Sequence, residues 1–231
     1  LIFNEGYSAT AGEHWMRPGL CEDALRLGRI LAGLVPNEPE VHGLVALMEI
    51  QASRPRARVG PSGEPILLLD QNRAQWDQLL IRRGLAALDR AQQLTTAQNR
   101  PAPYTTQAAI AACHARASTT AETDWSLIAR LYERLSLISP SPVVELNRAV
   151  AVSMASGPDE AIKIVDRLLA EPSLKPYRLL PSVRGDLLKK LGRFPEARAE
   201  FERAATLTRN ARERGLLLDR ASECRDATQS Q

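Results

Sequence analysis

Aromatic side chains are scarce in this sequence, at 4% of its 231 residues. Proteins that hold single-stranded nucleic acid stack the bases on aromatic rings, so the composition argues against that class. An excess of one charge is lacking as well, because 30 Lys and Arg residues face 27 Asp and Glu residues, a formal net charge of +3. Duplex binding takes most of its affinity from phosphate neutralisation, so we expect this chain to bind DNA weakly.

Cysteine is also rare, with three residues, Cys21, Cys113 and Cys224, far apart in the sequence. An odd number of distant cysteines predicts no disulfide framework and indicates a reducing compartment, which we interpret as the cytoplasm. No apolar run approaches the roughly 18 to 20 residues of a membrane span, and no signal-peptide pattern opens the chain, so no membrane partner is expected. Leu1 is not Met and stands in an apolar-rich stretch, which predicts a fragment without its N-terminal part.

Catalytic motifs are lacking too. The sequence contains no glycine-rich phosphate loop, no GxSxG elbow and no HExxH zinc motif. Cys113 and His114 are adjacent, and neighbouring helical residues point about 100° apart, which is a poor arrangement for a nucleophile pair or a metal site. His14 and His42 have no ligand set near them in the sequence. We therefore predict no catalytic residues, no metal, no cofactor and no enzymatic activity.

Amphipathic helical periodicity is what the sequence does have, and it is clearest over residues 181–209. Apolar residues recur there at three- and four-residue steps in two runs, which predicts two helices with one apolar face each. Gly192 stands where a left-handed helix end is favoured, and Pro195 stands in the first turn of the next helix, so a hairpin is expected. The apolar positions are Leu180, Val183, Leu187 and Leu191, then Phe194, Ala197, Phe201, Ala204 and Ala205.

Small residues make this hairpin resemble a tetratricopeptide (TPR) unit. Gly185 and Ala197 are expected at the close crossing of the two helices, with Phe201 filling the remaining space. A helix-turn-helix DNA reader is the rival interpretation. That motif needs exposed polar residues on its second helix, where this sequence places small and aromatic ones, so we favour the TPR-like hairpin.

The hairpin pattern recurs upstream at a near-regular spacing. Ala161 lies 36 residues before Ala197, and Ile128 lies 33 residues before Ala161, each in the second of two helix-like runs. A period near 34 residues is typical of TPR arrays. We therefore predict an all-α fold, a TPR-like helical-hairpin array (an α-α superhelix) of about ten helices, with at most a trace of strand around Ile66–Leu69.

One domain over residues 1–231 is expected, because 44% hydrophobic residues can supply one continuous core. Its predicted parts are a junction at 1–18, an Arg-, Pro- and Gly-rich loop at 54–65, a central helix at 70–98 and helical hairpins over 104–225.

Two of these parts allow two interpretations each. Residues 1–18 could dock the array on a preceding domain, with Phe3, Tyr7 and Trp15 as apolar anchors, or could be an ordinary capping segment. Residues 54–65 are rich in loop-forming residues and could be a mobile surface connector, which we favour, or a contact to phosphate or nucleic acid.

The most distinctive stretch is DQNRAQWD at residues 70–77. Asp70 is expected to cap the helix that follows, because its carboxylate can accept from the first helical amides. Arg73 and Asp77 lie four residues apart and are expected to pair on the helix surface. Trp76 is expected to begin an apolar stripe along the helix. Structural roles of this kind could explain every residue of the stretch.

LLLDQNRAQWD also resembles a signature of extracytoplasmic-function RNA polymerase sigma factors that carry a C-terminal TPR-like extension, where it usually reads DQDRxxWD. Asn72 departs from the usual Asp, which removes a negative charge and weakens any argument for a metal there. Four further stretches are similar to the same extension, so that the resemblance covers nearly the whole chain. They are LIFNEGYSA, PYTTQAAIAACHA, TDWSLIARLY and SPVVELNRAVAV.

The resemblance implies that the chain is the regulatory C-terminal domain of such a sigma factor. Sigma regions two and four have no counterpart in the sequence, so the implied partners are the protein's own sigma core and RNA polymerase, with promoter DNA reached only through the missing regions. The alternative is a free-standing TPR-like adaptor that captures a peptide or small ligand in its groove. The interaction residues that we predict are Asp70, Gln71, Arg73, Trp76 and Asp77, together with Phe3, Asn4, Glu5 and Tyr7.

Overall fold

The computed structural model describes residues 2–7, 16–61, 63–98 and 101–229 of the chain. Within these ranges the regular structure is helical, with eleven α-helices and four short 3-10 helices and no extended strand. Val59 and Pro65 form an isolated antiparallel bridge, and a 3-10 turn at Leu68–Asp70 occupies the place where a trace of strand was expected. The predicted all-α array of helical hairpins is thereby confirmed.

The described residues divide into two compact units, the first running to Ser139 and the second starting at Pro140. The sequence led us to expect one continuous domain, because the hairpin pattern continues across this boundary. The predicted run of hairpins over 104–225 is divided between the units accordingly. Each unit is described by itself.

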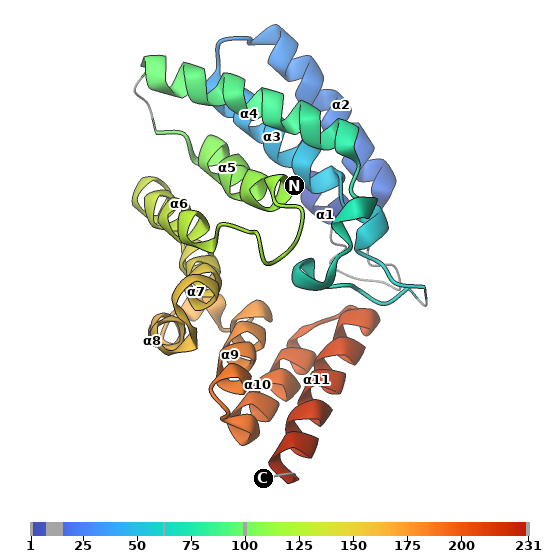
Figure 1. The fold of residues 1–231 in the computed structure, drawn as a ribbon, viewed down its shortest axis with the longest axis vertical. Coiled ribbons are helices and arrows are strands. Elements are labelled where there is room, and N and C mark those ends of the chain that lie inside the picture. Colours follow the sequence, from blue (N-terminus) through green and yellow to red (C-terminus); the bar gives the residue numbers. More distant parts are fainter. Residues whose placement is uncertain (1, 8–15, 62, 99–100, 230–231) are drawn as a thin grey trace. The chain divides into compact units, whose positions relative to one another are not determined.

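Helix α3 is the centre of the first unit, because α2, α4 and α5 all pack against it. Figure 1 shows α2, α3 and α4 side by side. Glycines allow these close approaches: a Cβ on Gly84 of α4 would lie 2.6 Å from Ile50 Cγ1 of α3. The α-helices of the unit are α1 (Ile2–Tyr7), α2 (Pro18–Leu34), α3 (Pro39–Ala52), α4 (Gln78–Gln98), α5 (Pro103–Arg116) and α6 (Trp125–Ile138). Its short 3-10 helices are η1 (Pro55–Ala57), η2 (Leu68–Asp70) and η3 (Arg73–Gln75).

The predicted central helix at 70–98 is wrong in its start and in its position. The observed helix α4 begins at Gln78, and the residues before it form the two 3-10 turns η2 and η3. The central position belongs to α3, which is buried on most of its surface because it is apolar nearly all round.

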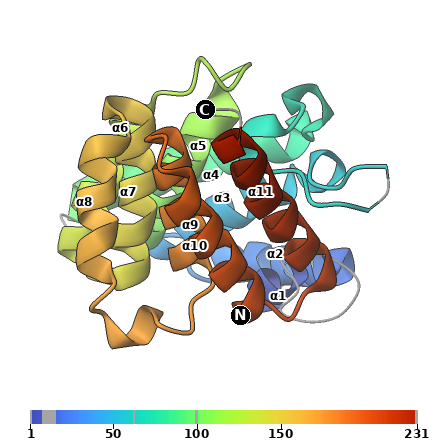
Figure 2. The ribbon, with the colours of Figure 1, turned by 90° about the horizontal axis from the view of Figure 1, so that it is seen from below.

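The second unit is built from two hairpins and a last helix. Helices α7 and α8 pair, α9 packs against both of them, α10 pairs with α9, and α11 covers α10. Figure 2 shows α9, α10 and α11 next to one another. Gly157 and Gly192 follow α7 and α9 with positive φ angles of 98° and 73°, which residues other than glycine rarely adopt. The bounds are α7 (Pro142–Ser156), α8 (Pro158–Leu168), η4 (Pro172–Leu174), α9 (Leu179–Lys190), α10 (Phe194–Leu207) and α11 (Ala211–Gln229).

The α9–α10 hairpin has the packing that its sequence predicts. Phe201 and Ala197 are completely buried, and a Cβ on Gly185 would lie 2.8 Å from Phe201 Cε1. The absence of a side chain at Gly185 therefore makes room for the Phe201 ring.

Replacing Ala197 with leucine should overpack this hairpin, because the added atoms enter a space that is already filled. We expect a loss of about 1 to 3 kcal/mol in the free energy of unfolding of the second unit. Hydrogen exchange of the α9 and α10 amides measures this loss directly. Arg198→Ala is the control, since the exposed Arg198 makes only a surface ion pair with Glu202 at 2.7 Å. Equal exchange in both variants would show that Ala197 has room around it.

None of the helices in the described part of the chain combines the length and the hydrophobicity needed to cross a bilayer.

Candidate functional site

The signature stretch at residues 70–77 alternates between buried and exposed side chains. Gln71, Arg73 and Trp76 are buried, whereas Asp70 and Asp77 are exposed. Gln71 Nε2 donates to the carbonyl of Ile66 at 3.1 Å, which ties the segment to the chain just before it. The predicted site residues of this stretch therefore face two ways, and only the two carboxylates are open to solvent.

Arg73 is a buried anchor and does not pair with Asp77, so the predicted surface pair is wrong. Its Nη1 donates to the carbonyls of His114 at 2.9 Å and Ala117 at 2.8 Å, and its Nη2 donates to Thr123 Oγ1 at 2.7 Å. These acceptors lie at the end of α5 and in the loop after it. Arg73 therefore holds the last turn of α5, whose carbonyls have no partner within the helix.

Asp77, and not Asp70, caps the following helix. Its Oδ1 accepts from the amides of Leu79 at 2.8 Å and Leu80 at 3.0 Å, and its own amide donates to the carbonyl of Ser53 at 2.8 Å. Asn72 does the same for the short η3 helix, where its Oδ1 accepts from the Ala74 amide at 3.0 Å. The predicted cap was thus placed seven residues too early, because the chain turns twice before α4 begins.

Replacing Asp77 with alanine should cost about 1 kcal/mol of stability, the usual effect of losing an N-cap. All three tryptophans, at positions 15, 76 and 125, precede Ser139, so urea unfolding followed by tryptophan fluorescence reports on the first unit. Asp70→Ala is the matched control and should leave the midpoint unchanged, since the Asp70 side chain accepts no hydrogen bond from any residue that the structure describes. Equal midpoints for the two variants would contradict the assignment of the cap to Asp77.

Trp76 lies in the core, where it packs with Ala57 and Ile81. Two guanidinium groups face its ring: the Cζ of Arg54 lies 5.5 Å and the Cζ of Arg73 lies 5.4 Å from the ring centroid. Both distances are within the range of cation–π attraction, which is strongest for tryptophan. Trp76 precedes α4, so it does not begin a stripe on that helix as predicted.

The N-terminal helix α1 meets the same cluster through Tyr7. The rings of Phe3 and Tyr7 are stacked with centroids 5.8 Å apart, and the Cζ of Arg58 lies 3.6 Å and that of Arg54 5.6 Å from the Tyr7 ring centroid. Arg58 Nη1 also donates to the Tyr7 carbonyl. The structure therefore brings Tyr7 to the residues around Trp76, with Arg54 in contact with both rings.

The other predicted residues of the N-terminal segment lie outside this cluster. Glu5 forms an ion pair with Arg17 at 3.4 Å, and the Asn4 side chain is exposed. Trp15, a predicted anchor, lies outside the described residues. The contacts of Tyr7 with Arg54 and Arg58 attach this segment to the first unit.

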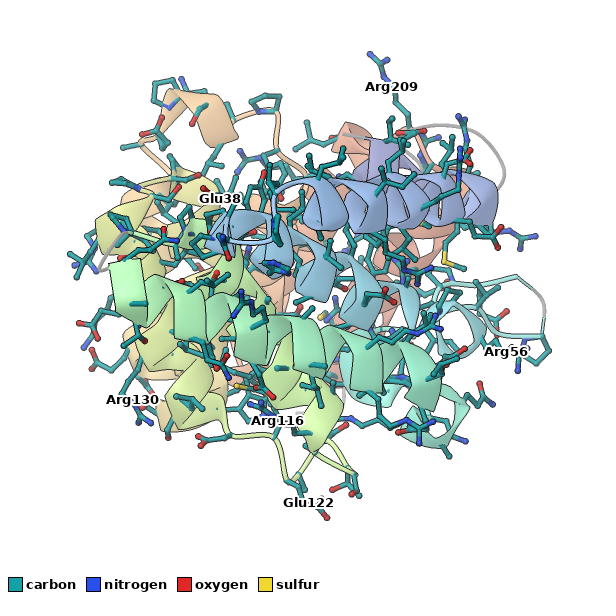
Figure 3. The ribbon with its side chains drawn as sticks, turned by 90° about the horizontal axis from the view of Figure 1, so that it is seen from above. Glu38, Arg56, Arg116, Glu122, Arg130 and Arg209 are labelled. Carbon is teal, nitrogen blue, oxygen red and sulfur yellow. The ribbon has the colours of Figure 1, made fainter. Side chains whose placement is uncertain are left out.

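The 54–65 segment was predicted as a mobile surface connector, and its first part does not fit that description. Arg54, Ala57 and Arg58 are buried, and η1 packs against η3. Arg56 alone of the three arginines is exposed, at the outer edge of the segment (Figure 3). Nothing in the sequence distinguishes it from Arg54 and Arg58, which the prediction therefore missed as site residues.

His114 completes the cluster and was also missed, because its position next to Cys113 drew attention only to metal and nucleophile chemistry. It is 8% exposed, and its ring meets that of Trp125 edge-on with centroids 5.1 Å apart. Burial, with Arg54 and Arg73 nearby, lowers the pKa of His114 to about 4. The imidazole is therefore neutral at physiological pH.

The electrostatics of the cluster are unusual because the positive charges have few acids around them. Among the residues that the structure describes, no carboxylate lies within ion-pair distance of Arg54 or Arg73. Glu122 is the acid whose charge acts on Arg73, and its Oε2 already accepts from the Ser118 amide at 3.0 Å. Figure 3 shows Glu122 on the loop between α5 and α6. Burial lowers the pKa of both Arg54 and Arg73 below its ordinary value.

A small apolar cavity of about 130 Å³ adjoins the Tyr7 side of the cluster, between α1, α2 and the end of α3. Tyr7, Cys21, Leu25 and Leu80 are among its lining residues. Elsewhere in the described ranges, no three His, Cys, Asp or Glu side chains come together as metal ligands would.

Comparison with known proteins gives relatives without a known function. Residues 1–92 match the model of a family described as a family of unknown function (DUF6596). The chain is 48% identical over 213 residues, or 92% of its length, to an uncharacterized protein of Rhizobium meliloti (strain 1021). It spans about half of that relative, 49% of its length. No solved structure matches the chain.

Proposed function

We propose that this chain is the regulatory C-terminal part of an extracytoplasmic-function RNA polymerase sigma factor in the bacterial cytoplasm. In this proposal it has no enzymatic activity of its own. It modulates transcription initiation through contacts with the sigma core, regions two and four, or with the polymerase. Promoter DNA is bound by those regions and not by this chain, whose net charge is only +3.

The observation that supports this proposal most is that two separate stretches of the resemblance meet in one cluster. LIFNEGY supplies Tyr7 and DQNRAQWD supplies Trp76, and Arg54 contacts both rings. Arg73 extends the connection to the carbonyls at the end of α5. A displacement of α1 would therefore disturb the segment that leads into α4, which is the behaviour required of a junction between a regulatory array and a preceding domain.

The division into buried and exposed residues suggests which of them touch the partner. Arg73 and Trp76 are buried and hold the segment in position, and Asp77 is occupied as a helix cap. Asp70 is exposed, and no described side chain or amide holds its carboxylate. In the proposal, Asp70 makes the contact with the sigma core, while the buried residues hold it in place.

Transcription in vitro by the full-length protein with core RNA polymerase tests this role. Asp70→Ala should lower sigma-dependent transcription about tenfold, the effect of losing one charged contact, while the melting temperature of residues 1–231 stays unchanged. Asp219→Ala, which removes an exposed acid from α11, is the control and should leave transcription unchanged. If the Asp70→Ala variant directs transcription at the level of the control, Asp70 does not contact the sigma core.

The small cavity beside Tyr7 favours the second candidate, a free-standing adaptor that binds a small ligand. Its volume of about 130 Å³ is close to that of an engineered cavity that binds benzene, so an apolar group of that size could enter. If the full-length protein neither binds core polymerase nor directs transcription, the sigma-factor proposal fails and the adaptor becomes the better explanation.

A further inference from the structure

Two buried arginines in the first unit carry charges that no described acid neutralises. Arg54 is 7% exposed and Arg73 is 8% exposed, and both guanidinium carbons lie within 5.5 Å of the Trp76 ring centroid. Arginine stays protonated in proteins, so both charges are present in the folded chain. Two like charges repel one another, and each has lost most of its contact with water.

Hydrogen-bond donors gather at the same place without acceptors. Nε of Arg54, Nε of Arg73 and Nε1 of Trp76 are buried and have no partner among the described residues. Nδ1 of His114, which is a donor in one tautomer of the neutral ring and an acceptor in the other, is also buried without a partner. The Arg54 side chain donates no hydrogen bond to any residue within the described ranges, whereas the terminal nitrogens of Arg73 make three. Buried polar atoms of native proteins are nearly always paired, so four unpaired ones in one cluster require an explanation.

We infer that the cluster of Arg54, Arg73, Trp76 and His114 is a binding site for an anionic oxygen group, a carboxylate or a phosphate. Such a group supplies both things that the cluster lacks, negative charge and hydrogen-bond acceptors. Guanidinium groups bind carboxylate and phosphate oxygens through two parallel hydrogen bonds, and Arg54 has its whole donor set available for them.

Other ligand chemistries fit the cluster less well. A cation would be repelled by both guanidinium groups, and a neutral polar group would accept hydrogen bonds without balancing the charge. The phosphate backbone of duplex DNA is excluded by burial, since a rigid duplex cannot reach donors that are more than nine-tenths covered. A small anion or a single acidic side chain is small enough to approach Arg54, which keeps 7% of its surface exposed.

The inference does not depend on the sigma-factor proposal. Anion binding is a property of the first unit and is measured on residues 1–231 without polymerase or DNA. Each proposal can therefore fail while the other stands. If both hold, the anion is the signal or the internal contact that sets the junction between α1 and the signature stretch.

Proton–nitrogen NMR of the arginine Nε–H groups tests the site in the unmodified chain. Inorganic phosphate is titrated against chloride at constant ionic strength and constant pH, at millimolar concentrations, where its general stabilising effect on proteins is small. We expect two Nε–H resonances, those of Arg54 and Arg73, to shift and saturate. If no Nε–H resonance shifts more in phosphate than in chloride, the inferred anion site is wrong.

Arg54→Gln and Arg56→Gln form a matched pair, because the two arginines stand two residues apart and only Arg54 is buried. Arg54→Gln should weaken the apparent Kd for phosphate about tenfold or more, the loss expected for one charged hydrogen-bond partner. Arg56→Gln should leave Kd unchanged. Equal weakening in both variants would show a diffuse surface effect and overturn the site. If Arg54→Gln does not fold, saturation of the Arg54 resonance in the unmodified chain decides the question.

A second arm distinguishes a free anion from an acidic side chain of the same protein. The titration is repeated on the full-length protein, whose relative from Rhizobium meliloti (strain 1021) is about twice as long as this chain. If phosphate still saturates the two resonances, the ligand is a free oxyanion. If the resonances start at their saturated positions and phosphate no longer moves them, the longer polypeptide supplies the carboxylate.

Discussion

Replacing Arg73 with alanine should destabilise the first unit by about 3 to 4 kcal/mol. The substitution removes three hydrogen bonds from a charged donor, each worth about 1.5 to 3 kcal/mol, and relief from burying the charge offsets part of that loss. It also leaves the carbonyls of His114 and Ala117 without their donor at the end of α5. Urea unfolding followed by tryptophan fluorescence measures the effect, since all three tryptophans precede Ser139.

Arg82→Ala is the control for this substitution. Arg82 is an exposed arginine of α4, and its removal should change the stability by no more than about 0.5 kcal/mol. Arg73→Lys should recover little, because one ammonium cannot reach three acceptors that a planar guanidinium spans. If Arg73→Ala and Arg82→Ala unfold at the same urea concentration, Arg73 is not the anchor that its contacts indicate.

This expected effect is much larger than the sequence alone suggests for Arg73, because the residues that Arg73 contacts are distant along the chain. A spacing of four residues between Arg73 and Asp77 suggests a surface pair worth a few tenths of a kcal/mol. The true acceptors of Arg73 stand 41, 44 and 50 residues further on. Local sequence patterns do not indicate a partner at that separation, so Arg73 was predicted to pair with Asp77 on the surface although it is buried.

Local signals explain why the second unit was predicted better than the first. The α9–α10 hairpin is specified by neighbours in the sequence: a repeat of apolar residues, Gly192 at a positive φ and Pro195 in the first turn. The segment before α4 contains two possible caps, Asp70 and Asp77, and only the contact of the Asp77 amide with Ser53 decides between them. That contact is tertiary, and periodicity carries no information about it.

Buried arginines are the part of the candidate site that the sequence did not predict. Arginine is among the residues most often exposed, so RPRAR between two helices is reasonably interpreted as a surface loop. In the structure Arg56 is exposed, as that interpretation expects, whereas Arg54 and Arg58 are buried. Arg54 packs over the ring of Trp76 and Arg58 packs over the ring of Tyr7. The resemblance identified both aromatic residues, but it gave no indication of the arginines beside them.

Acidification below about pH 6.5 should destabilise the first unit because of His114. The folded-state pKa of His114 is lowered to about 4 by burial and by Arg54 and Arg73, against about 6.5 for an exposed histidine. Between these two values the unfolded chain binds a proton that the folded chain does not, so stability falls as the pH falls. Stability from this group is fully present above about pH 6.5 and is lost by about pH 4, a total on the order of 3 kcal/mol.

His114→Gln isolates this contribution, because glutamine has a similar size and no charge in that range. The free energy of unfolding of the unmodified chain should decline from pH 6.5 to 4.5, while that of the variant declines much less. The buffers should contain neither phosphate nor carboxylate, because an anion beside Arg54 and Arg73 would favour the protonated imidazole and raise the pKa of His114. Parallel curves for the two proteins would mean that His114 titrates alike in the folded and unfolded states. A decline that becomes shallower when phosphate is added would place the anion close enough to His114 to act on its charge.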